Sequence, residues 1–362
     1  MFDVKEWIVP ALKGAGVYSQ KLGVISDENP ELARMCLNEN PMAPSQKVID
    51  AVAKVGELGS RYPGLCNDLK AKIGGMFDLG PENVMMANGS SEIIDSMMRA
   101  FLQEGDEVLM PTPTFSLFYA RASVVGAKQT LIQFTDDGEL DYDVNNYLNA
   151  ISDKTKLILI VTPNNPTGAF MAEEDLRTIL DRGIPTCIDE AYLEFHPDKP
   201  NMAHLVKDYP NAFVSHTLSK AYGLAGFRFG YLLGRPEMVE VFETLALPWN
   251  LGYAPLLAAE AAFDDAETLK RNVDHMTRWN KRFTEELTAL GLKPLHWAGN
   301  FLMVDANVSG KTSQEIFDAA IEAGVILKTI GAVHGKKGYF RLTPGSDEEN
   351  ERALAFFKRF FG

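Results

Sequence analysis

Residues 212–233 read AFVSHTLSKAYGLAGFRFGYLL, a pattern that predicts two apolar strands joined by a polar turn with glycines. The turn carries Lys220, preceded by Thr217 and Ser219 and followed by Arg228. A lysine held between two core strands loses hydration, which disfavours its charged form and leaves a nucleophilic amine. An isolated lysine more often lies in a surface loop, so the rest of the chain has to decide between the two interpretations.

Short apolar runs recur along the chain with helical segments between them. The expected strands are residues 83–87, 107–110, 157–161, 185–188, 212–215 and 229–233. The expected helices among them are residues 46–58, 91–102 and 172–181. Strands that alternate with helices predict an α/β fold, with a mostly parallel sheet sandwiched by helices. Ligands of such sheets collect beyond the carboxyl ends of the strands.

The pattern changes after residue 250, and 362 residues exceed the usual limit for a single core. The expected elements there are a helical region at 255–290, strands at 300–304, 325–328 and 339–342, and helices at 313–323 and 347–361. We predict a large domain at 43–250 and a smaller α+β domain at 251–362. Residues 1–42 form an N-terminal arm that joins the smaller domain.

The composition excludes several classes of partner. The chain has 35 Lys and Arg against 49 Asp and Glu, a net charge of −14, which argues against nucleic acid and anionic membranes. Cys36, Cys66 and Cys187 show no metal-ligand spacing, so we expect no metal site and a reducing compartment. With no apolar run of about 18 residues and no signal-peptide pattern, we expect a cytoplasmic protein.

Three consecutive predicted strands end in polar residues of different chemistry. Asn165 follows the first strand, Asp189 and Tyr192 follow the second, and Lys220 follows the third. Separations of 24 and 31 residues suit one crossover each, so these side chains are expected to converge at one edge of the sheet. The set suits pyridoxal 5'-phosphate: the amine forms an imine, the carboxylate keeps the ring nitrogen protonated, and amide and phenol bind the ring oxygen.

A further segment supplies an anion site where a strand leads into a helix. Glycine allows close approach of the backbone there, and the free N–H groups and helix dipole favour a phosphate. The residues expected around the phosphate are Gly89, Ser90, Ser91, Thr217, Ser219 and Arg228. Serine before glutamate is by itself an ordinary helix cap. Phe115 also follows a strand end, where it would stack on the cofactor ring or belong to the core.

Eight segments, in order, carry a resemblance to a known family. They are NENP at 38–41, RYPG at 61–64, NGS at 88–90, PTF at 113–115, NNPTG at 164–168, DEAY at 189–192, the Lys220 segment, and FRLT at 340–343. Together they resemble fold-type I pyridoxal-phosphate aminotransferases of class I/II, and among these most closely the histidinol-phosphate aminotransferase family. The resemblance runs nearly end to end.

The resemblance implies roles for individual residues. Lys220 would be the imine-forming lysine and general base, Asp189 the partner of the ring nitrogen, and Asn165 and Tyr192 the groups that bind the ring oxygen. Tyr62 would reach the cofactor phosphate of the other subunit, which implies a homodimer with shared active sites. Phe115 stands where the family usually has a tyrosine. The residues expected to face the substrate are Arg341, Asn40, Tyr18 and Lys328.

One departure from the family leaves the substrate open. Histidinol-phosphate enzymes usually have arginine where this chain has Lys328, thirteen residues before Arg341, and lysine lacks the bidentate grip of arginine. Histidinol phosphate, a phospho-amino acid, an aromatic amino acid and a specialised metabolite remain candidates for a ping-pong exchange with a 2-oxo acid. A decarboxylase of the phosphothreonine type is an alternative within the fold. A DNA-binding regulator is disfavoured by the acidic charge.

Overall fold

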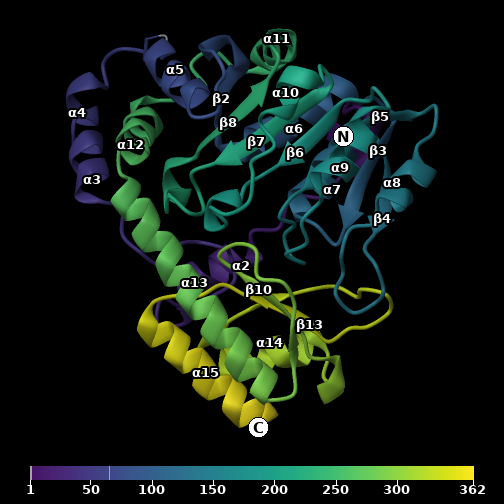
Figure 1. Cartoon of the computed structure of the whole chain (residues 1–362), viewed down its shortest axis with the longest axis vertical. Helices are drawn as coiled ribbons and strands as arrows, with labels where there is room; N and C mark the ends of the chain where they lie inside the picture. Colours follow the sequence, from purple (N-terminus) through teal and green to yellow (C-terminus); the bar gives the residue numbers. More distant parts are fainter. Residues whose placement is uncertain (1, 65) are drawn as a thin grey trace.

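The structure is a computed structural model that describes residues 2–64 and 66–362. Its largest element is a seven-stranded sheet with the order β2-β8-β7-β6-β5-β3-β4 (Figure 1). The strands are β2 (Val84–Asn88), β3 (Glu107–Thr112), β4 (Lys128–Gln133), β5 (Thr155–Val161), β6 (Thr186–Asp189), β7 (Ala212–Thr217) and β8 (Phe229–Gly234). The prediction of an α/β fold with a mostly parallel sheet is confirmed.

Strand β8 departs from the parallel pattern, because it runs antiparallel to both β2 and β7. Only residues 218–228 connect β7 to β8. A parallel return needs a crossover of a dozen or more residues, usually with a helix, so this short connection reverses the chain instead. Lys220 and Arg228 therefore lie on one tight connection between two neighbouring strands.

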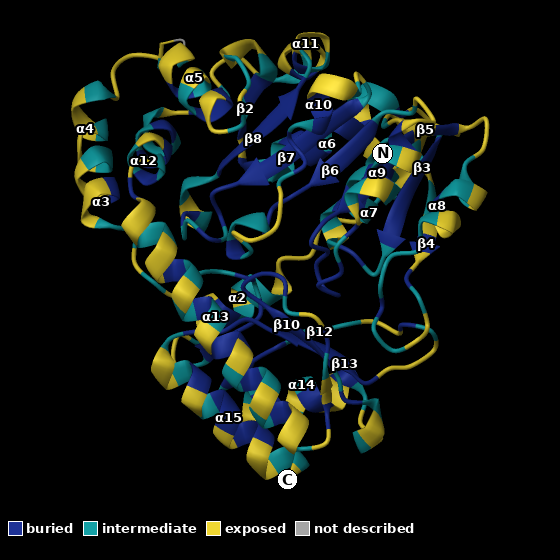
Figure 2. Cartoon of the chain, viewed as in Figure 1, coloured by how far each residue is buried: buried dark blue, intermediate teal, exposed yellow. Residues whose placement is uncertain are grey.

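Helices cover both faces of the large sheet, because its strands are apolar on both sides. One face packs on α6 (Gly89–Phe101), α7 (Ser116–Val124) and α11 (Pro236–Leu245). The other face packs mainly on α3 (Gln46–Ala53), α5 (Asn67–Gly75), α8 (Val144–Ala150), α9 (Glu173–Leu180), α10 (Leu205–Asp208) and α12 (Tyr253–Phe263). In β5, Leu157 and Leu159 join the first core, whereas Ile158 and Ile160 join the second. Figure 2 shows the strands buried beneath partly exposed helices.

A second unit surrounds a four-stranded sheet with the order β12-β13-β10-β9. Its strands are β9 (Lys293–Pro294), β10 (Leu302–Asp305), β12 (Lys328–Thr329) and β13 (Tyr339–Leu342). Its helices are α13 (Ala266–Ala289), α14 (Ser313–Glu322) and α15 (Asp347–Phe361). Phe283, Phe340 and Phe357 lie in its core. Figure 1 shows α13 running from the side of the large sheet to this unit.

The N-terminal residues contribute to this second unit. Strand β1 (Ala33–Arg34) pairs in parallel with β11 (Val325–Ile326). Before it come the short helices η1 (Val4–Glu6), α1 (Pro10–Gly14) and α2 (Lys21–Glu28). Within the described residues, no helix combines the length and the apolar content needed to span a bilayer.

Three predicted elements differ from the structure. The helix expected at 46–58 is interrupted at Lys54, where α3 gives way to α4 (Val55–Leu58). The helical region at 255–290 is two helices, because the Asp265 carboxylate accepts the Thr268 N–H and starts α13 as a new helix. The strand expected at 325–328 is divided between β11 and β12, which pair with different partners.

Candidate active site

Lys220 lies in the connection after β7, with its amine directed to the second unit. Its Nζ donates a hydrogen bond to the Asn38 carbonyl oxygen at 3.0 Å and lies 5.7 Å from the centroid of the Tyr192 ring. The residue keeps some solvent contact, but its amine is enclosed by protein atoms. Burial lowers the pKa of Lys220 to about 8, and the positive charge of Arg341 acts in the same direction. The amine is thus partly deprotonated near neutral pH.

Asp189 ends β6 and lies between the neighbouring ends of β5 and β7. It is the register partner of Val161 on one side and of Ser215 on the other. The carboxylate is buried, and its Oδ1 accepts the N–H of Ala191 at 3.0 Å. Burial raises the pKa of Asp189 to about 6, against the lowering effects of that hydrogen bond and of the positive charge of His216. The three strand ends predicted to converge are adjacent in the sheet.

The Tyr192 hydroxyl is the centre of a buried amide network. It accepts hydrogen bonds from Asn38 Nδ2 at 2.9 Å and from Asn165 Nδ2 at 3.2 Å. The Tyr192 ring packs edge-on against Phe301, with centroids 4.9 Å apart. Burial raises the pKa of Tyr192 to about 12, so the phenol is protonated at neutral pH. Two amides and one phenol therefore offer polar groups at one place.

Asn38 is a functional candidate to which the sequence assigned no role. Its backbone has a φ of +54°, in the left-handed region that asparagine tolerates better than most residues. Its carbonyl oxygen accepts from Lys220, its side-chain amide donates to Tyr192, and its Oδ1 accepts from Thr343 Oγ1 at 3.0 Å. The NENP segment at 38–41 was a signal, but its contact with Lys220 depends on how the two units pack.

The start of α6 and the Arg228 guanidinium form a site of positive character. Arg228 donates to Ser219 Oγ and Ser91 Oγ, each at 3.3 Å, and to the Ala225 carbonyl oxygen at 3.1 Å. Gly89 opens α6 with a φ of +68°, and a Cβ there would collide with this guanidinium. In the described part of the chain, no carboxylate lies within ion-pair distance of Arg228. A half-buried cation beside a helix N-terminus suits a bound phosphate.

The other residues predicted to bind phosphate lie close to the same groups. Thr217 Oγ1 lies within hydrogen-bond distance of Ser219 Oγ, at 3.0 Å, and of the Phe229 carbonyl oxygen, at 3.2 Å. Ser90 N would lie 2.7 Å from a Cβ placed on Gly230 of β8. Strand β8 therefore supports the first turn of α6 by direct backbone contact. The six predicted residues come from two places in the chain that meet here. One is the start of α6 after β2, and the other is the connection from β7 to β8.

Arg341 and Lys328 lie opposite each other on the neighbouring strands β13 and β12. Arg341 is 7% exposed and donates to Asn165 Oδ1 and to the Cys36 carbonyl oxygen, each at 2.6 Å. Burial lowers the pKa of Lys328, and the charge of Arg341 adds to this effect. No acidic side chain pairs with either cation within residues 2–64 and 66–362. The second unit therefore presents uncompensated positive charge next to Asn165.

The remaining predicted residues make their contacts outside the network around Tyr192. Phe115 precedes α7, is half-buried, and packs edge-on against Phe118 with centroids 6.0 Å apart. Tyr18 accepts a hydrogen bond from Ser116 Oγ at 3.3 Å. Asn40 Oδ1 accepts the Met42 N–H, at 3.0 Å, in a local turn. Tyr62 is different, because it is 72% exposed and stacks on Trp249 with centroids 4.3 Å apart.

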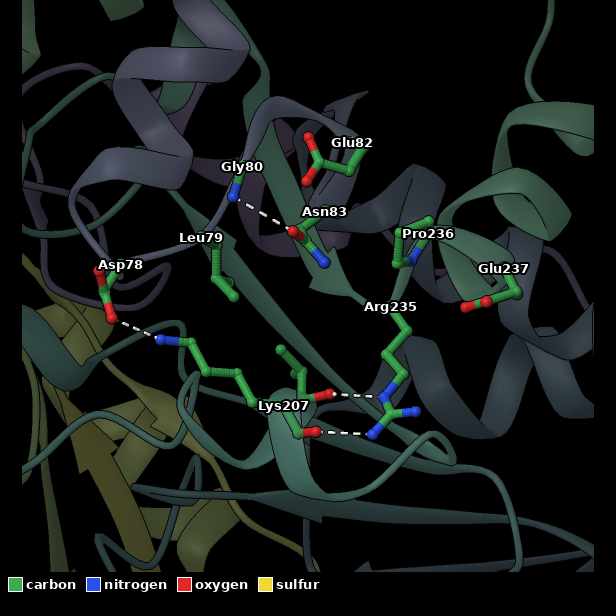
Figure 3. Close-up of a pocket in the computed structure, with 10 residues that line it drawn as sticks. Asp78, Leu79, Gly80, Glu82, Asn83, Lys207, Arg235, Pro236 and Glu237 are labelled. Atoms are coloured by element: carbon green, nitrogen blue, oxygen red, sulfur yellow. Dashed lines mark hydrogen bonds and ion pairs between the residues drawn. The ribbon is translucent and has the colours of Figure 1, made fainter.

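A surface hollow of about 460 Å³ lies away from Lys220, at the other end of the strands of the large sheet (Figure 3). Lys207 pairs with Asp78 across it at 2.6 Å, and Arg235 donates to the Lys207 carbonyl oxygen, also at 2.6 Å. Its lining residues precede β2 and β7 and follow the antiparallel strand β8, which places them at the amino ends of the parallel strands. None of the predicted site residues lines it. In the described residues, no cluster of His, Cys, Asp and Glu is arranged to hold a metal ion.

The sequence model of aminotransferase class I and II matches residues 30–357. This chain belongs to that family. Histidinol-phosphate aminotransferase 1 of Mannheimia succiniciproducens is 34% identical to this aminotransferase over 327 residues, 89% of this chain and 87% of the relative. Histidinol-phosphate aminotransferase of Anaeromyxobacter sp. is 33% identical over 343 residues, 91% of each chain.

Solved structures show the same fold. The histidinol-phosphate aminotransferase of Sinorhizobium meliloti, in complex with pyridoxal 5'-phosphate, has a TM-score of 0.86 and 23% identity and covers 96% of this aminotransferase and 95% of that chain. Aspartate aminotransferase of Thermus thermophilus with maleate has a TM-score of 0.85 and 20% identity, covering 97% and 99%. Enzymes named for different substrates thus share this architecture, so the fold alone does not identify the substrate.

These findings confirm three predictions: the fold-type I architecture, the aminotransferase class and the cofactor pyridoxal 5'-phosphate. The chain is a pyridoxal-phosphate-dependent transaminase. The same matches favour amino-group transfer over the decarboxylase alternative. The roles of individual residues and the identity of the substrate are questions for the geometry of the site.

Proposed function

We propose that this aminotransferase exchanges an amino group between an anionic donor, histidinol phosphate or an amino acid, and a 2-oxo acid by a ping-pong mechanism. One observation carries the proposal: Asn165 contacts both Tyr192 and Arg341, at 3.2 and 2.6 Å. It links the groups proposed for the cofactor ring to the cation proposed for the substrate. Cofactor and substrate would then share one amide between them.

The chemistry of the pocket fits pyridoxal phosphate. When bound, this cofactor supplies an aldehyde that an amine can capture and a ring that withdraws electrons from the α-carbon of the substrate. Arg228, without a carboxylate partner beside the start of α6, suits its phosphate. Asp189, ionised above its pKa of about 6, would hold a proton on the ring nitrogen. Asn165 and Tyr192 would bind the ring oxygen.

Lys220 would have two tasks at the same position. Its amine would capture the cofactor aldehyde, and once a donor replaces it, it would act as general base for the α-proton of that donor. A pKa of about 8 suits the second task, because general bases work best when their pKa is near the ambient pH. The hydrogen bond to the Asn38 carbonyl oxygen would fix the direction of the amine.

Arg341 and Lys328 would bind the anionic group of the substrate. The relatives named histidinol-phosphate aminotransferase support a phosphorylated amine as donor. Lys328 supplies one charge without the two parallel donors of arginine, so it attracts an anion without the bidentate geometry with which arginine binds phosphate. We therefore propose a donor with one strong anionic group, and include amino acids beside histidinol phosphate. Asn40 and Tyr18 would border this substrate.

We further propose a cytoplasmic homodimer. Tyr62 is 72% exposed and Trp249 is 60% exposed, an unusual state for two stacked aromatic rings in a monomer. In a dimer this stack would be covered, and Tyr62 would approach the cofactor phosphate of the other subunit. The three cysteines are free, which supports a reducing compartment.

The proposal is tested by trapping and by a donor screen. Borohydride reduction of the holoenzyme followed by peptide mapping should find the cofactor on Lys220, both in the wild type and in a Lys207→Ala control. In Lys220→Ala the adduct and turnover should be absent. Single-turnover spectra with histidinol phosphate, histidinol, histidine, aspartate and glutamate should show conversion only with anionic donors. An adduct on another lysine would contradict the site, and release of carbon dioxide without conversion would contradict the reaction.

A further inference from the structure

A buried histidine lies beside the proposed cofactor site without belonging to it. His216, on β7, is 2% exposed, and its ring stacks on Tyr231 with centroids 5.0 Å apart and packs on Phe77 at 5.2 Å. Its Nε2 lies 3.3 Å from Glu190 Oε2, and its Nδ1 lies 3.7 Å from Glu194 Oε1. One buried imidazole thus stands between the buried Glu190 carboxylate and the partly exposed Glu194 carboxylate, both of which follow β6.

The two carboxylates flank the turn that follows Asp189 and carries Tyr192. Asp189 immediately precedes Glu190, and Tyr192 lies between Glu190 and Glu194. Apart from His216, Glu190 is held by the Met202 N–H, which donates to Oε1 at 2.8 Å. Within the described residues, no basic side chain other than His216 lies within ion-pair distance of Glu190 or Glu194. A single side chain from β7 therefore closes both ends of this turn.

The charge balance of the cluster depends on His216. A buried carboxylate without a partner is strongly unfavourable, so the buried Glu190 favours the imidazolium form of His216, and the partly exposed Glu194 adds to this effect. Burial alone would lower the pKa of His216, but hydrogen bonding and charge from Glu190 and Glu194 outweigh it and raise the pKa to about 9. The other ionisable groups around the cluster are the phenols of Tyr231 and Tyr222, which burial keeps neutral.

The charge of His216 also reaches Asp189. It lowers the pKa of that carboxyl group, whereas the neighbouring Glu190 raises it. With His216 neutral, the Ala191 N–H and the charge of Lys220 would still favour the ionised form of Asp189, but the charge of His216 would no longer oppose that of Glu190. Asp189 would then take up its own proton more readily and lose the charge that holds a proton on the cofactor ring nitrogen.

We propose that His216 is a positioning residue of the active site: its imidazolium bridges Glu190 and Glu194, fixes the turn that carries Asp189 and Tyr192, and keeps Asp189 ionised. The inference rests on the role proposed above for Asp189. His216 itself touches neither substrate nor cofactor in this scheme. Its effect should therefore appear in cofactor affinity and its dependence on pH.

The test compares three variants by titrating apoenzyme with pyridoxal phosphate from pH 6 to 10. His216→Phe keeps the stacked ring and loses the charge, and His216→Arg restores a charge. His204→Phe is the control, because His204 is a half-exposed histidine that pairs with Glu173. At pH 7 we expect the dissociation constant to rise about tenfold or more in His216→Phe, to recover largely in His216→Arg, and to stay unchanged in the control.

Two further variants separate the possible failures. Asp189→Asn should weaken cofactor binding by itself; if it does not, the proposed role of Asp189 is wrong, whatever His216 does. If it does, and His216→Phe binds within twofold of the wild type, the inference about His216 is overturned. In the wild type we expect cofactor affinity to fall at alkaline pH, where His216 loses its proton. Should His216→Phe not fold, Glu194→Gln decides, because removing one carboxylate should make His216 lose its proton, and the enzyme its affinity, at a pH lower by about one unit. An unmoved alkaline limb would overturn the inference.

Discussion

Gly230→Ala should weaken cofactor binding although residue 230 touches no cofactor in the proposed site. A Cβ at Gly230 would lie 2.7 Å from Ser90 N, 2.8 Å from the Gly89 carbonyl carbon and 2.9 Å from the His216 carbonyl oxygen. All three are backbone atoms, so no side chain can turn away. Since ordinary contact begins near 3.4 Å, the start of α6 would have to move by about 0.7 Å.

The expected magnitude follows from that displacement. Overpacking of this kind typically destabilises a protein by about 1–3 kcal/mol. The moved N–H groups are those proposed for the phosphate, so we expect the dissociation constant of pyridoxal phosphate to rise at least about tenfold, equivalent to about 1.4 kcal/mol. Titration of apoenzyme with the cofactor gives the affinity, and urea unfolding gives the stability.

Gly234→Ala is the matched control on the same strand. Its Cβ would lie 3.2 Å from Cγ and 3.3 Å from Cβ of Met238, a flexible side chain that can adjust. We expect a stability change within about 1 kcal/mol and unchanged cofactor affinity. If Gly230→Ala binds the cofactor as tightly as Gly234→Ala, β8 does not position the first turn of α6 for the phosphate, and the reasoning is refuted.

Two other predictions concern the charged groups of the site. Apoenzyme with Lys220→Met should be more stable than the wild type by up to about 3 kcal/mol below pH 8, because the pKa of Lys220 falls from its ordinary 10.5 to about 8 on folding. Between pH 8 and 10.5 the unfolded chain holds more protons than the folded one, so the stability of the wild type rises across that window. Urea unfolding should therefore show the stability difference between variant and wild type shrinking as the pH rises. A difference that stays constant would contradict the low pKa assigned to Lys220. Arg341→Lys should raise KM for the anionic donor about tenfold and change kcat less, because lysine keeps the charge but loses the paired donors. Steady-state kinetics check this, and an unchanged KM with a lower kcat would speak against substrate binding by Arg341.

The sequence predicted the interior of the large sheet well. The run at 157–161 is continuously apolar, and the runs at 185–188 and 212–215 each contain one small polar residue, Thr186 or Ser215, because helices cover both sides of these strands. Strand β4, with the sequence KQTLIQ, was not predicted, because it lies at the sheet edge and only Ile132 is buried among its six residues. The antiparallel direction of β8 agrees with the short connection from β7. The sequence shows that this connection is short, but only the strand pairing in the structure shows that β7 and β8 are neighbours.

The site was predictable where it depends on strand ends. The strands β5, β6 and β7 are neighbours in the sheet, and Asn165, Asp189 and Lys220 lie at or just after their carboxyl ends. The spacing of these residues in the sequence was therefore enough to predict that they lie near one another. Asn38 was not predictable in its role, because its contacts with Lys220 and Tyr192 cross from the second unit to the large sheet. The pairing of His216 with Glu190 likewise needed the register of β6 and β7, in which Asp189 faces Ser215.

The short connection between β7 and β8 has a consequence for motion. Lys220 and Arg228 lie on it, Asp189 ends a strand of the same sheet, and Gly89 begins the helix α6 that packs on that sheet, so these groups proposed to hold the cofactor all belong to the large-sheet unit. Arg341, Lys328 and Asn38 belong to the other unit. A hinge rotation between the units would change the contacts of Arg341 and Lys328 with the substrate, while the cofactor would keep its contacts with the large sheet. Product could then leave without the coenzyme.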